Sequence, residues 1–379
     1  MTQVAVVLAA GKSTRMRSRI PKAAHSIAGR PLLAHVLFAA NAALDDARFA
    51  TPNSLLTSAH EAEDRGSQLV VVLGHEAERV KQALLEVRGL PSYQVALQAA
   101  PLGTGDAVRA ALPLLTGNGP ERPTTVLVLY GDSPLVRPAT LTRLLVTHEQ
   151  AGATVTFLTG EADRDTGYGR IVRDTAGLVR GIIEERHCTP EQLGITEVNS
   201  GIYCFQADWL WSRLSRVESH PSGEYYLTDL VDLAANEGRH IETISAPLNE
   251  TAGVNDRVEL SEAAAILRRR TLDDLMRSGV TIVDPATTDV DCGIPVGMDT
   301  TIYPFTVLHG ATEIGENCTI GPYSSIQDSL IGDNCTVLGS WLESAVMDAG
   351  ARVGPMSHLR PGTHLGTGVF LGNFGEIKN

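Results

Sequence analysis

Short runs of aliphatic residues recur in the first third of the chain. Each run is continuous rather than alternating, so a strand formed there would be apolar on both faces, which is typical of strands buried inside a parallel sheet. The runs cover residues 4–8, 69–73 and 126–129. Between and around them, apolar residues follow helical spacing in residues 31–44, 76–87 and 106–112. This alternation predicts an α/β fold, a Rossmann-like doubly wound domain.

Two details refine this prediction. Pro31 suits the first turn of the first predicted helix, because proline needs no N–H partner there. Residues 45–67 are polar and follow no period, so we expect a surface insertion.

Apolar residues return at helical spacing in residues 257–277, which predicts one long helix. The period rests on Leu260, Ala264, Leu267 and Leu275, and Gly279 stands where a C-terminal cap is expected. A helix of this length spans roughly 30 Å and would be a rigid linker over residues 257–279.

Downstream of this helix, single aliphatic residues recur at intervals of six. They form two runs, Ile314, Ile320 and Ile326, and then Val353, Leu359, Leu365, Leu371 and Ile377. A period of six is neither helical nor that of an alternating strand, and it predicts a left-handed parallel β-helix whose axis is filled by stacked aliphatic residues. Residues 291–379 also hold 14 of the 36 glycines, which suits repeated turns. We therefore expect residues 1–256 and 280–379 to form different domains.

Composition and charge exclude several classes of function. The chain has 379 residues and a formal net charge of −13. We expect no binding to nucleic acid and no binding to an anionic membrane, because both require a basic face. No apolar run reaches the ~20 residues needed to cross a bilayer. The five cysteines include no Cys-x-x-Cys pair, which favours a reducing, cytoplasmic compartment.

Candidate chemistry begins in the loop after the first predicted strand. Val6 stands where a Walker A loop needs glycine, and Gly11 alone cannot make a Gly-x-Gly-x-x-Gly motif. Small residues at positions 9–11 leave backbone N–H groups open to an anion, and Arg15 and Lys22 add two cations. The set suits a nucleoside triphosphate, although an ordinary turn with two surface cations would have the same residues.

Asp132 follows the third aliphatic run, at the sheet edge where ligands bind in such folds. Its carboxylate either caps the next helix or holds Mg²⁺, which proteins bind through one or two oxygens together with substrate phosphates. Asn255 has the same two interpretations, which do not exclude each other, because the long helix begins just after it.

A series of motifs in a fixed order resembles a known family. The motifs lie at residues 8–16, 97–98, 102–107, 129–132, 168–171, 183–184, 198–202, 223–229 and 253–257. The first resembles the signature of sugar-1-phosphate nucleotidylyltransferases. Together with the six-residue repeats, the series is similar to the bacterial bifunctional N-acetylglucosamine-1-phosphate uridylyltransferases/glucosamine-1-phosphate N-acetyltransferases over nearly the whole chain.

The resemblance implies that residues 1–256 transfer UMP from UTP to N-acetylglucosamine-1-phosphate, giving UDP-N-acetylglucosamine and pyrophosphate. It implies Mg²⁺ bound by Asp132 and Asn255, with Arg15, Lys22 and Asp132 as catalytic residues. It assigns nucleotide contacts to Leu8, Ala9, Ala10 and Gly11, uracil recognition to Gln98, Gly103 and Thr104, the cleft wall to Tyr130 and Gly131, and sugar contacts to Gly169, Glu184 and Asn199. Pro101 stands where the family usually has a polar residue.

The resemblance also implies a second activity for the family. Its β-helix transfers acetyl from acetyl-CoA to glucosamine-1-phosphate, and Arg360 and Lys378 match two positions that bind the sugar phosphate. The family's catalytic histidine and acetyl-CoA contacts lie in later coils. We therefore expect residues 280–379 to be the N-terminal part of the acetyltransferase domain, in a truncated chain that has lost this activity. Such domains usually trimerise, and we expect a homotrimer.

Two other functions fit parts of the pattern. A nucleotidylyltransferase making a dTDP- or ADP-sugar would differ in a few hydrogen bonds to the base. A non-catalytic assembly subunit would share the two-domain plan, but it would not need to keep Arg15, Lys22, Asp132 and Asn255 together.

Overall fold

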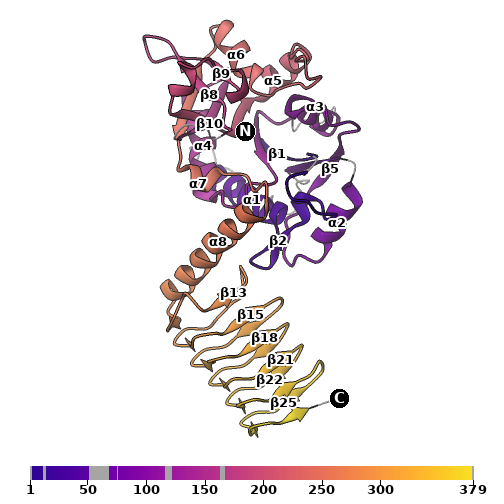
Figure 1. Cartoon of the computed structure of the whole chain (residues 1–379), viewed down its shortest axis with the longest axis vertical. Helices are drawn as coiled ribbons and strands as arrows, with labels where there is room; N and C mark the ends of the chain where they lie inside the picture. Colours follow the sequence, from indigo (N-terminus) through magenta and orange to yellow (C-terminus); the bar gives the residue numbers. More distant parts are fainter. Residues whose placement is uncertain are drawn as a thin grey trace. The chain divides into compact units, whose positions relative to one another are not determined.

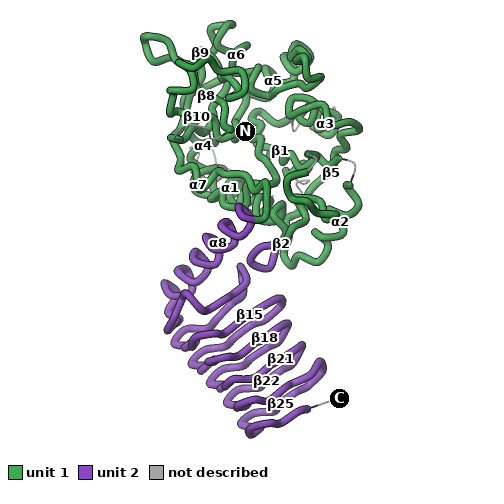
Figure 2. Tube along the Cα trace, in the orientation of Figure 1, with its two compact units in different colours: residues 1–25, 31–257 green, residues 26–30, 258–379 purple. Residues whose placement is uncertain are grey.

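The computed structural model describes residues 2–11, 14–50, 68–74, 76–115, 122–162 and 167–377. The chain forms two compact units (Figure 2). Unit 1 comprises Met1–His25 and Pro31–Arg257, and unit 2 comprises Ser26–Arg30 and Val258–Asn379. Among the described residues, no helix is long and apolar enough to cross a membrane.

Unit 1 is built on a nine-stranded sheet. Seven strands follow the order β11-β7-β10-β6-β1-β4-β5, and β8 and β9 extend from β10. The bounds are β1 Gln3–Ala9, β4 Leu69–Leu73, β5 Gln94–Leu97, β6 Thr125–Tyr130, β7 Val155–Glu161, β8 Arg170–Arg173, β9 Val179–Ile183, β10 Glu197–Gln206 and β11 Ile241–Ser245. Strands β1, β4 and β6 contain the three predicted aliphatic runs and pair in parallel, as predicted, whereas β10 runs antiparallel to β6 and β7.

Helices cover both faces of this sheet (Figure 1). They are α1 Leu32–Ala50, α2 Ala77–Leu85, α3 Thr104–Leu115, α4 Pro138–Ala151, α5 Ala207–Leu214, α6 Asp229–Asn236 and α7 Leu248–Thr251, with the 3₁₀ turns η1 Lys22–Ala24, η4 Glu185–His187 and η5 Gln192–Gly194. Successive strand residues point to opposite faces. Val7 accordingly belongs to one core with Leu37 of α1, and Val6 belongs to the other with Val108 of α3. The predicted doubly wound domain is confirmed.

The predicted bounds of the first helix need correction at both ends. Pro31 lies in the two-residue strand β3, Arg30–Pro31, which pairs with β2, Ser26–Ile27, so the helix begins at Leu32. At the other end α1 continues to Ala50, and the first part of the predicted insertion is therefore helical. The Asn41 amide donates to the Asp45 carboxylate one turn later, at 3.0 Å, which supports the helix on its exposed side. Ala47 is buried, so the helix still packs against the core beyond the predicted end. Residues 51–67 of that insertion lie outside the described residues.

The long helix α8 covers Arg257–Arg277, where the apolar spacing predicts it. Its end is capped as expected, because Gly279 has φ +100° and the Val280 N–H donates to the Leu275 carbonyl oxygen. Leu272 of α8 is fully buried in the core of unit 2.

The rest of unit 2 consists of short strands stacked in three parallel sheets, which is typical of a left-handed β-helix (Figure 1). One sheet contains β12 Thr281–Ile282, β14 Thr301–Ile302, β17 Thr319–Ile320, β20 Thr336–Val337, β23 Arg352–Val353 and β26 Phe370–Leu371. A second contains β13 Asp289–Val290, β15 Val307–His309, β18 Ser325–Gln327, β21 Trp341–Glu343, β24 His358–Leu359 and β27 Glu376–Ile377. The third contains β16 Glu313–Ile314, β19 Leu330–Ile331, β22 Val346–Met347 and β25 His364–Leu365.

Each strand of the β-helix directs one aliphatic side chain inward. Ile320, Val337 and Val353 are buried at equivalent positions of successive coils, 17 and 16 residues apart rather than 18. Shorter turns in the middle coils therefore interrupt the six-residue period that is regular on either side. Cys318 and Cys335 are also buried, and both are free thiols.

Candidate active site

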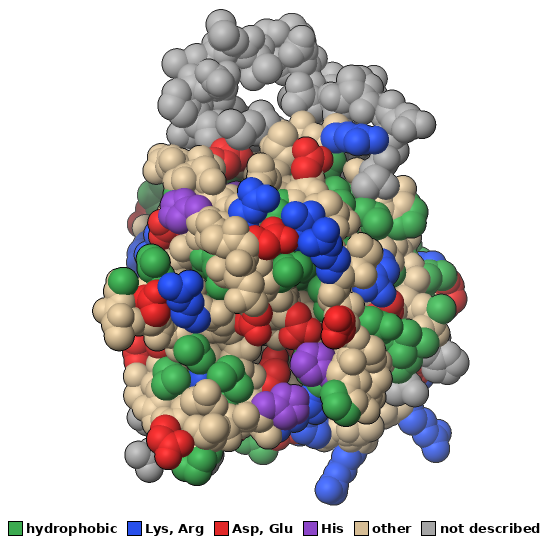
Figure 3. Space-filling view, turned by 90° about the horizontal axis from the view of Figure 1, so that it is seen from above, with side chains coloured by type: hydrophobic (Ala, Val, Ile, Leu, Met, Phe, Trp, Pro, Cys, Tyr) green, Lys and Arg blue, Asp and Glu red, His purple; other side chains and the backbone are tan. Residues whose placement is uncertain are grey.

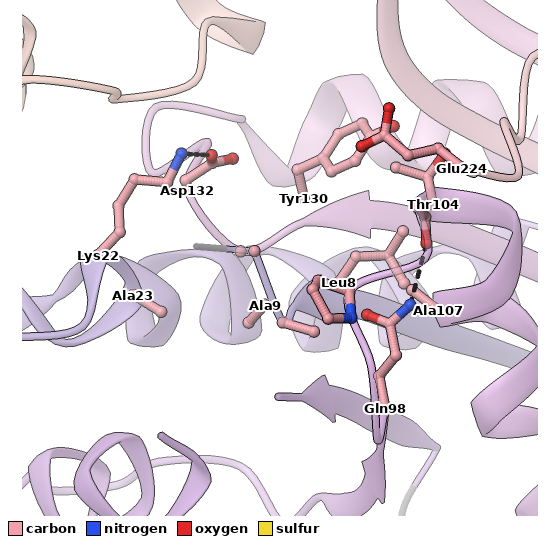
Figure 4. Close-up of a pocket in the computed structure, with 15 residues that line it drawn as sticks. Leu8, Ala9, Lys22, Ala23, Gln98, Thr104, Ala107, Tyr130, Asp132 and Glu224 are labelled. Atoms are coloured by element: carbon pink, nitrogen blue, oxygen red, sulfur yellow. Dashed lines mark hydrogen bonds and ion pairs between the residues drawn. The ribbon is translucent and has the colours of Figure 1, made fainter. Parts of the chain in front are cut away.

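The carboxyl ends of β1 and β6 meet at a cleft of about 480 Å³ (Figure 4). This is the edge at which open parallel sheets bind their ligands. The cleft is lined by Leu8, Ala9, Ala10, Gly11, Lys22, Ala23, Gln98, Pro101, Gly103, Thr104, Ala107, Tyr130, Gly131, Asp132 and Glu224. The structure thus brings together, from five segments of unit 1, the residues predicted to contact the nucleotide through the backbone at positions 8–11 and those predicted to recognise uracil.

The glycines that line the cleft differ in their local surroundings. A Cβ at Gly131 would lie 3.0 Å from Ala9 Cβ and from Leu33 Cδ1, so close packing requires glycine there. A Cβ at Gly11 would meet nothing within 4 Å, so the space above this backbone is open to a ligand. Gly103 has φ +95° and lies against the Tyr225 carbonyl oxygen, a conformation that glycine alone adopts readily.

Two cations and two oxygen ligands converge at one end of the cleft. The Lys22 ammonium contacts the Asp132 carboxylate and donates to Asn255 Oδ1 at 3.1 Å. Arg15 donates to the same Asn255 oxygen at 2.9 Å. Figure 4 shows Lys22 and Asp132 pointing toward one another. Asp132 and Asn255 therefore place two side-chain oxygens against one positive charge.

Gln98 closes the opposite end of the cleft. Its side chain is buried, and its Nε2 donates to the Gly103 carbonyl oxygen at 3.1 Å and to Asp106 at 2.9 Å. Thr104 Oγ1 accepts from the Leu227 N–H at 3.0 Å. Because both N–H groups of the Gln98 amide have partners, its carbonyl oxygen is held in one orientation as an acceptor.

The residues predicted to contact the sugar lie on β8, β9 and β10 or directly beside them. The Asn199 N–H donates to the Gly169 carbonyl oxygen at 2.8 Å, which brings these two together. Glu184 Oε1 accepts from the Thr228 hydroxyl at 3.2 Å. Burial and the nearby Glu184 carboxylate raise the pKa of Tyr130. Tyr130 therefore links the Glu184 region to the cleft that it lines.

The predicted residues of the β-helix are arranged differently. Arg360 donates to Glu376 at 2.6 Å, so the guanidinium that we predict to bind phosphate is already paired with a carboxylate of the next coil. His358 and His364 lie within 3.1 Å and 3.0 Å of Glu343 and Asp348. Lys378 lies outside the described residues.

Several candidate residues were missed by sequence reasoning. A second cleft of about 580 Å³ shares the backbone of residues 9–11 and Lys22 with the first and is also lined by Arg17 and Arg19. A signal was present, because arginines alternate at positions 15, 17 and 19. Glu224 lines the first cleft, and it belongs to a motif that carried no assigned role.

Comparisons with known proteins agree with both units. The MobA-like NTP transferase domain family matches residues 5–177, and the bacterial transferase hexapeptide family (six repeats) matches residues 296–328. Among solved structures, CMP:2-keto-3-deoxy-manno-octonic acid synthetase complexed with CTP matches with a TM-score of 0.49 at 18% identity, covering 71% of this chain and 100% of that chain. This likeness is too weak to bear on function.

Curated relatives match along almost the entire chain. "Bifunctional protein GlmU" of Pelobacter propionicus is 42% identical over 99% of this chain and 76% of its own length. The proteins of the same name from Trichlorobacter lovleyi and Enterococcus faecalis are 43% and 40% identical, with the same coverage. At this identity and coverage, the chain belongs to the family of bifunctional GlmU proteins.

Proposed function

We propose that unit 1 transfers UMP from UTP to N-acetylglucosamine-1-phosphate, releasing pyrophosphate and forming UDP-N-acetylglucosamine. The observation that carries this proposal is the convergence of Arg15, Lys22, Asp132 and Asn255 at one end of a cleft whose other end is closed by Gln98. Family membership supports the same reaction. The phosphates of a nucleotide need positively charged groups at one end of such a cleft, and its nucleobase needs fixed hydrogen-bonding groups at the other end.

In the proposed reaction, an oxygen of the sugar phosphate attacks the α-phosphorus of UTP. A P–O bond forms there while the bond to the β-phosphate breaks, and pyrophosphate leaves with the electron pair. The nucleophile is already an anion near neutral pH, so no general base is required. Lys22 and Arg15 contribute by orienting the phosphates and neutralising their charge.

We propose Mg²⁺ as the cofactor, held by Asp132 and Asn255. The fit rests on the donor set, because one carboxylate oxygen and one amide oxygen already surround the Lys22 ammonium and are the ligand types that Mg²⁺ prefers. Bound there, the ion would neutralise charge on the phosphates. Lys22 would then exchange the Asp132 carboxylate for a phosphate oxygen, a change that its flexible side chain allows.

The fixed acceptor on Gln98 supports uridine as the nucleoside. Uracil presents an N–H between two carbonyl oxygens, so it pairs with one acceptor flanked by donors, and backbone N–H groups near Gly103 would supply donors. Thymine presents the same hydrogen-bonding edge as uracil. After UTP, this observation therefore favours dTTP, and a dTDP-sugar enzyme is the second candidate. We propose Gly169, Glu184 and Asn199 as sugar contacts and Tyr130 and Gly131 as the connecting wall.

A pyrophosphate-release assay tests these proposals. UTP, dTTP and ATP are each paired with N-acetylglucosamine-1-phosphate and with glucose-1-phosphate. We expect the highest kcat/KM for UTP with N-acetylglucosamine-1-phosphate. Higher activity with ATP or dTTP would overturn the choice of base, and no pyrophosphate release with any pair in the presence of Mg²⁺ would support a non-catalytic subunit.

For unit 2 we propose a role in assembly and in binding glucosamine-1-phosphate, for which Arg360 and Lys378 are the proposed contacts. Exposed apolar side chains on successive coils support a homotrimer. They include Phe305, Tyr323, Met356 and Phe374, and the first two rings stack at 4.9 Å.

We propose a cytoplasmic location and no binding to nucleic acid or membranes. All five cysteines lie among the described residues and are unpaired, as suits a reducing compartment. On the described part of the face in Figure 3, Lys and Arg side chains lie among Asp and Glu rather than in a continuous basic patch.

A further inference from the structure

Arg170 is the largest fully buried side chain of unit 1, with a relative exposure of 0%. Its guanidinium donates to the Tyr168 carbonyl oxygen at 2.6 Å and to Glu185 Oε2 at 2.8 Å. Among the described residues, the buried Arg170 Nε has no partner. A buried ion pair is a poor source of stability, since apolar residues of similar volume often do better, and the unpaired N–H adds to its cost. Its position therefore calls for a reason other than stability.

That position is the junction of the three strands beside which the proposed sugar contacts lie. Arg170 begins β8, directly after Gly169. It pairs with Val198 of β10, next to Asn199, and with Ile183 of β9, next to Glu184. One residue in each neighbouring strand thus separates Arg170 from a proposed contact.

The two adjacent carboxylates Glu184 and Glu185 have different partners. Glu185 binds Arg170, whereas Glu184 accepts from the Thr228 hydroxyl and influences Tyr130 of the cleft. Glu184 is extended, with φ −57° and ψ 135°, and the η4 turn begins at Glu185. Anchoring Glu185 fixes the first residue of this turn, and hence the direction in which the Glu184 side chain leaves the chain.

We propose that Arg170 is a positioning residue for the sugar phosphate, acting through Glu185 to hold Glu184 and through β8 to hold Gly169 against Asn199. This inference rests on the proposed function of the cleft. It predicts a selective effect, because the nucleotide contacts lie on β1, β6 and the segments after β5, which Arg170 does not touch. A general loss of structure would affect both substrates.

Glu185→Gln is the first test, because the Glu185 side chain is partly exposed and the amide still accepts a hydrogen bond from Arg170. We expect the KM for N-acetylglucosamine-1-phosphate to rise about tenfold, the scale of a misplaced binding group, while the KM for UTP stays within about twofold. Arg170→Lys should act in the same direction. The double variant should be no worse than the worse single variant, since both changes weaken the same ion pair.

A matched control lies at the other end of β8. Arg173 of β8 makes two hydrogen bonds of 2.7 Å to Glu197 of β10, so Glu197→Gln weakens an ion pair of the same strand β8 that does not involve Glu185. We expect Glu197→Gln to leave both KM values unchanged. Near-UV circular dichroism and a thermal melt of each variant identify any protein that has not folded.

The outcomes separate this inference from the function on which it rests. If the wild-type chain does not use the sugar phosphate, the proposed function fails. If the wild type is active and folded Glu185→Gln and Arg170→Lys change neither KM or raise both KM values equally, the positioning role is wrong. An equal effect of Glu197→Gln on the sugar-phosphate KM would also overturn it, because the effect would then belong to strand pairing in general.

Discussion

The two units bury polar side chains in different ways. In unit 2 the buried hydroxyls repeat from coil to coil and bond to backbone, as when Ser340 donates to the Leu338 carbonyl oxygen and accepts from the Ser357 N–H. In unit 1 the buried polar groups are each of a different kind. Gln98 and Asn199 are examples, and both lie at or beside the cleft. Repeated polar burial satisfies the backbone of a solenoid, whereas unrepeated polar burial marks a site.

The largest expected effect tests whether activity resides in unit 1. Asp132→Ala should lower kcat of uridylyl transfer by about 10²–10³-fold, the scale of removing a major electrostatic group. The measurement is pyrophosphate release over a range of Mg²⁺ concentrations.

Ser340→Ala is the matched change in unit 2. It removes a buried hydroxyl and should leave kcat unchanged. If folded Asp132→Ala turns over at a near-normal rate, or if Ser340→Ala loses as much kcat as Asp132→Ala, then buried polar groups of unit 1 and unit 2 do not differ in their importance for activity.

A second substitution tests whether the apolar stack stabilises unit 2 alone. Ile326 is fully buried on the axis of the β-helix, so Ile326→Ala should destabilise that unit by about 2–5 kcal/mol through lost contacts and a cavity. We expect calorimetry to show a lower transition for unit 2 and an unchanged kcat/KM for uridylyl transfer. Equal lowering of every transition would mean that the units unfold as one.

The repeat of unit 2 could be predicted from local pattern, because each coil contacts only its neighbours. Buried Ile314, Ile320 and Ile326 follow from spacing alone. The order of the sheet in unit 1 could not be predicted this way. Strand β10 lies between β6 and β7 although it follows both in sequence, and such non-local pairing leaves no periodic signal.

The same contrast holds for the site. The ordered motifs predicted residues such as Lys22 and Asp132, which the structure brings together. Arg170 lies in the motif at residues 168–171, but nothing in that motif indicated its burial, since an arginine at the start of a strand is ordinarily exposed. Its burial depends on Glu185, 15 residues away, and on the strands around it.

A change of pH should shift the stability of the two units in opposite directions. Burial lowers the pKa of His148 in unit 1 to about 4, from an ordinary value of 6.5. The folded unit then stays neutral while the unfolded chain takes up a proton, so unit 1 loses stability as pH falls below about 6.5. At pH 5 the contribution of His148 is a loss of about 2 kcal/mol, part of which is offset by Asp232, because burial raises the pKa of that carboxyl to about 6.

In unit 2, a hydrogen bond to Asp291 raises the pKa of His309. The contribution of His309 to the stability of unit 2 is fully present below the pKa of the unfolded chain. It is lost as pH rises through the pKa of His309 in the folded unit. Thermal melts at pH 5 and pH 8 check both signs. His148→Gln should remove the His148 contribution to the loss between pH 8 and pH 5, and an undiminished loss in that variant would assign it to another group.

The smallest expected effect concerns base recognition at Gln98. Gln98→Leu keeps the volume of the side chain but removes the fixed acceptor, so kcat/KM for UTP should fall about tenfold and the preference over ATP should narrow. Asp106→Asn is the control, because the amide oxygen still accepts from Gln98 Nε2 and should keep the Gln98 carbonyl oriented. Pyrophosphate release measured with both nucleotides decides between two explanations. If Gln98→Leu and Asp106→Asn lose activity with UTP and ATP equally, Gln98 maintains the shape of the cleft and does not read the base. A loss confined to UTP and to Gln98→Leu makes its buried amide a recognition group, unlike the repeated hydroxyls of the β-helix.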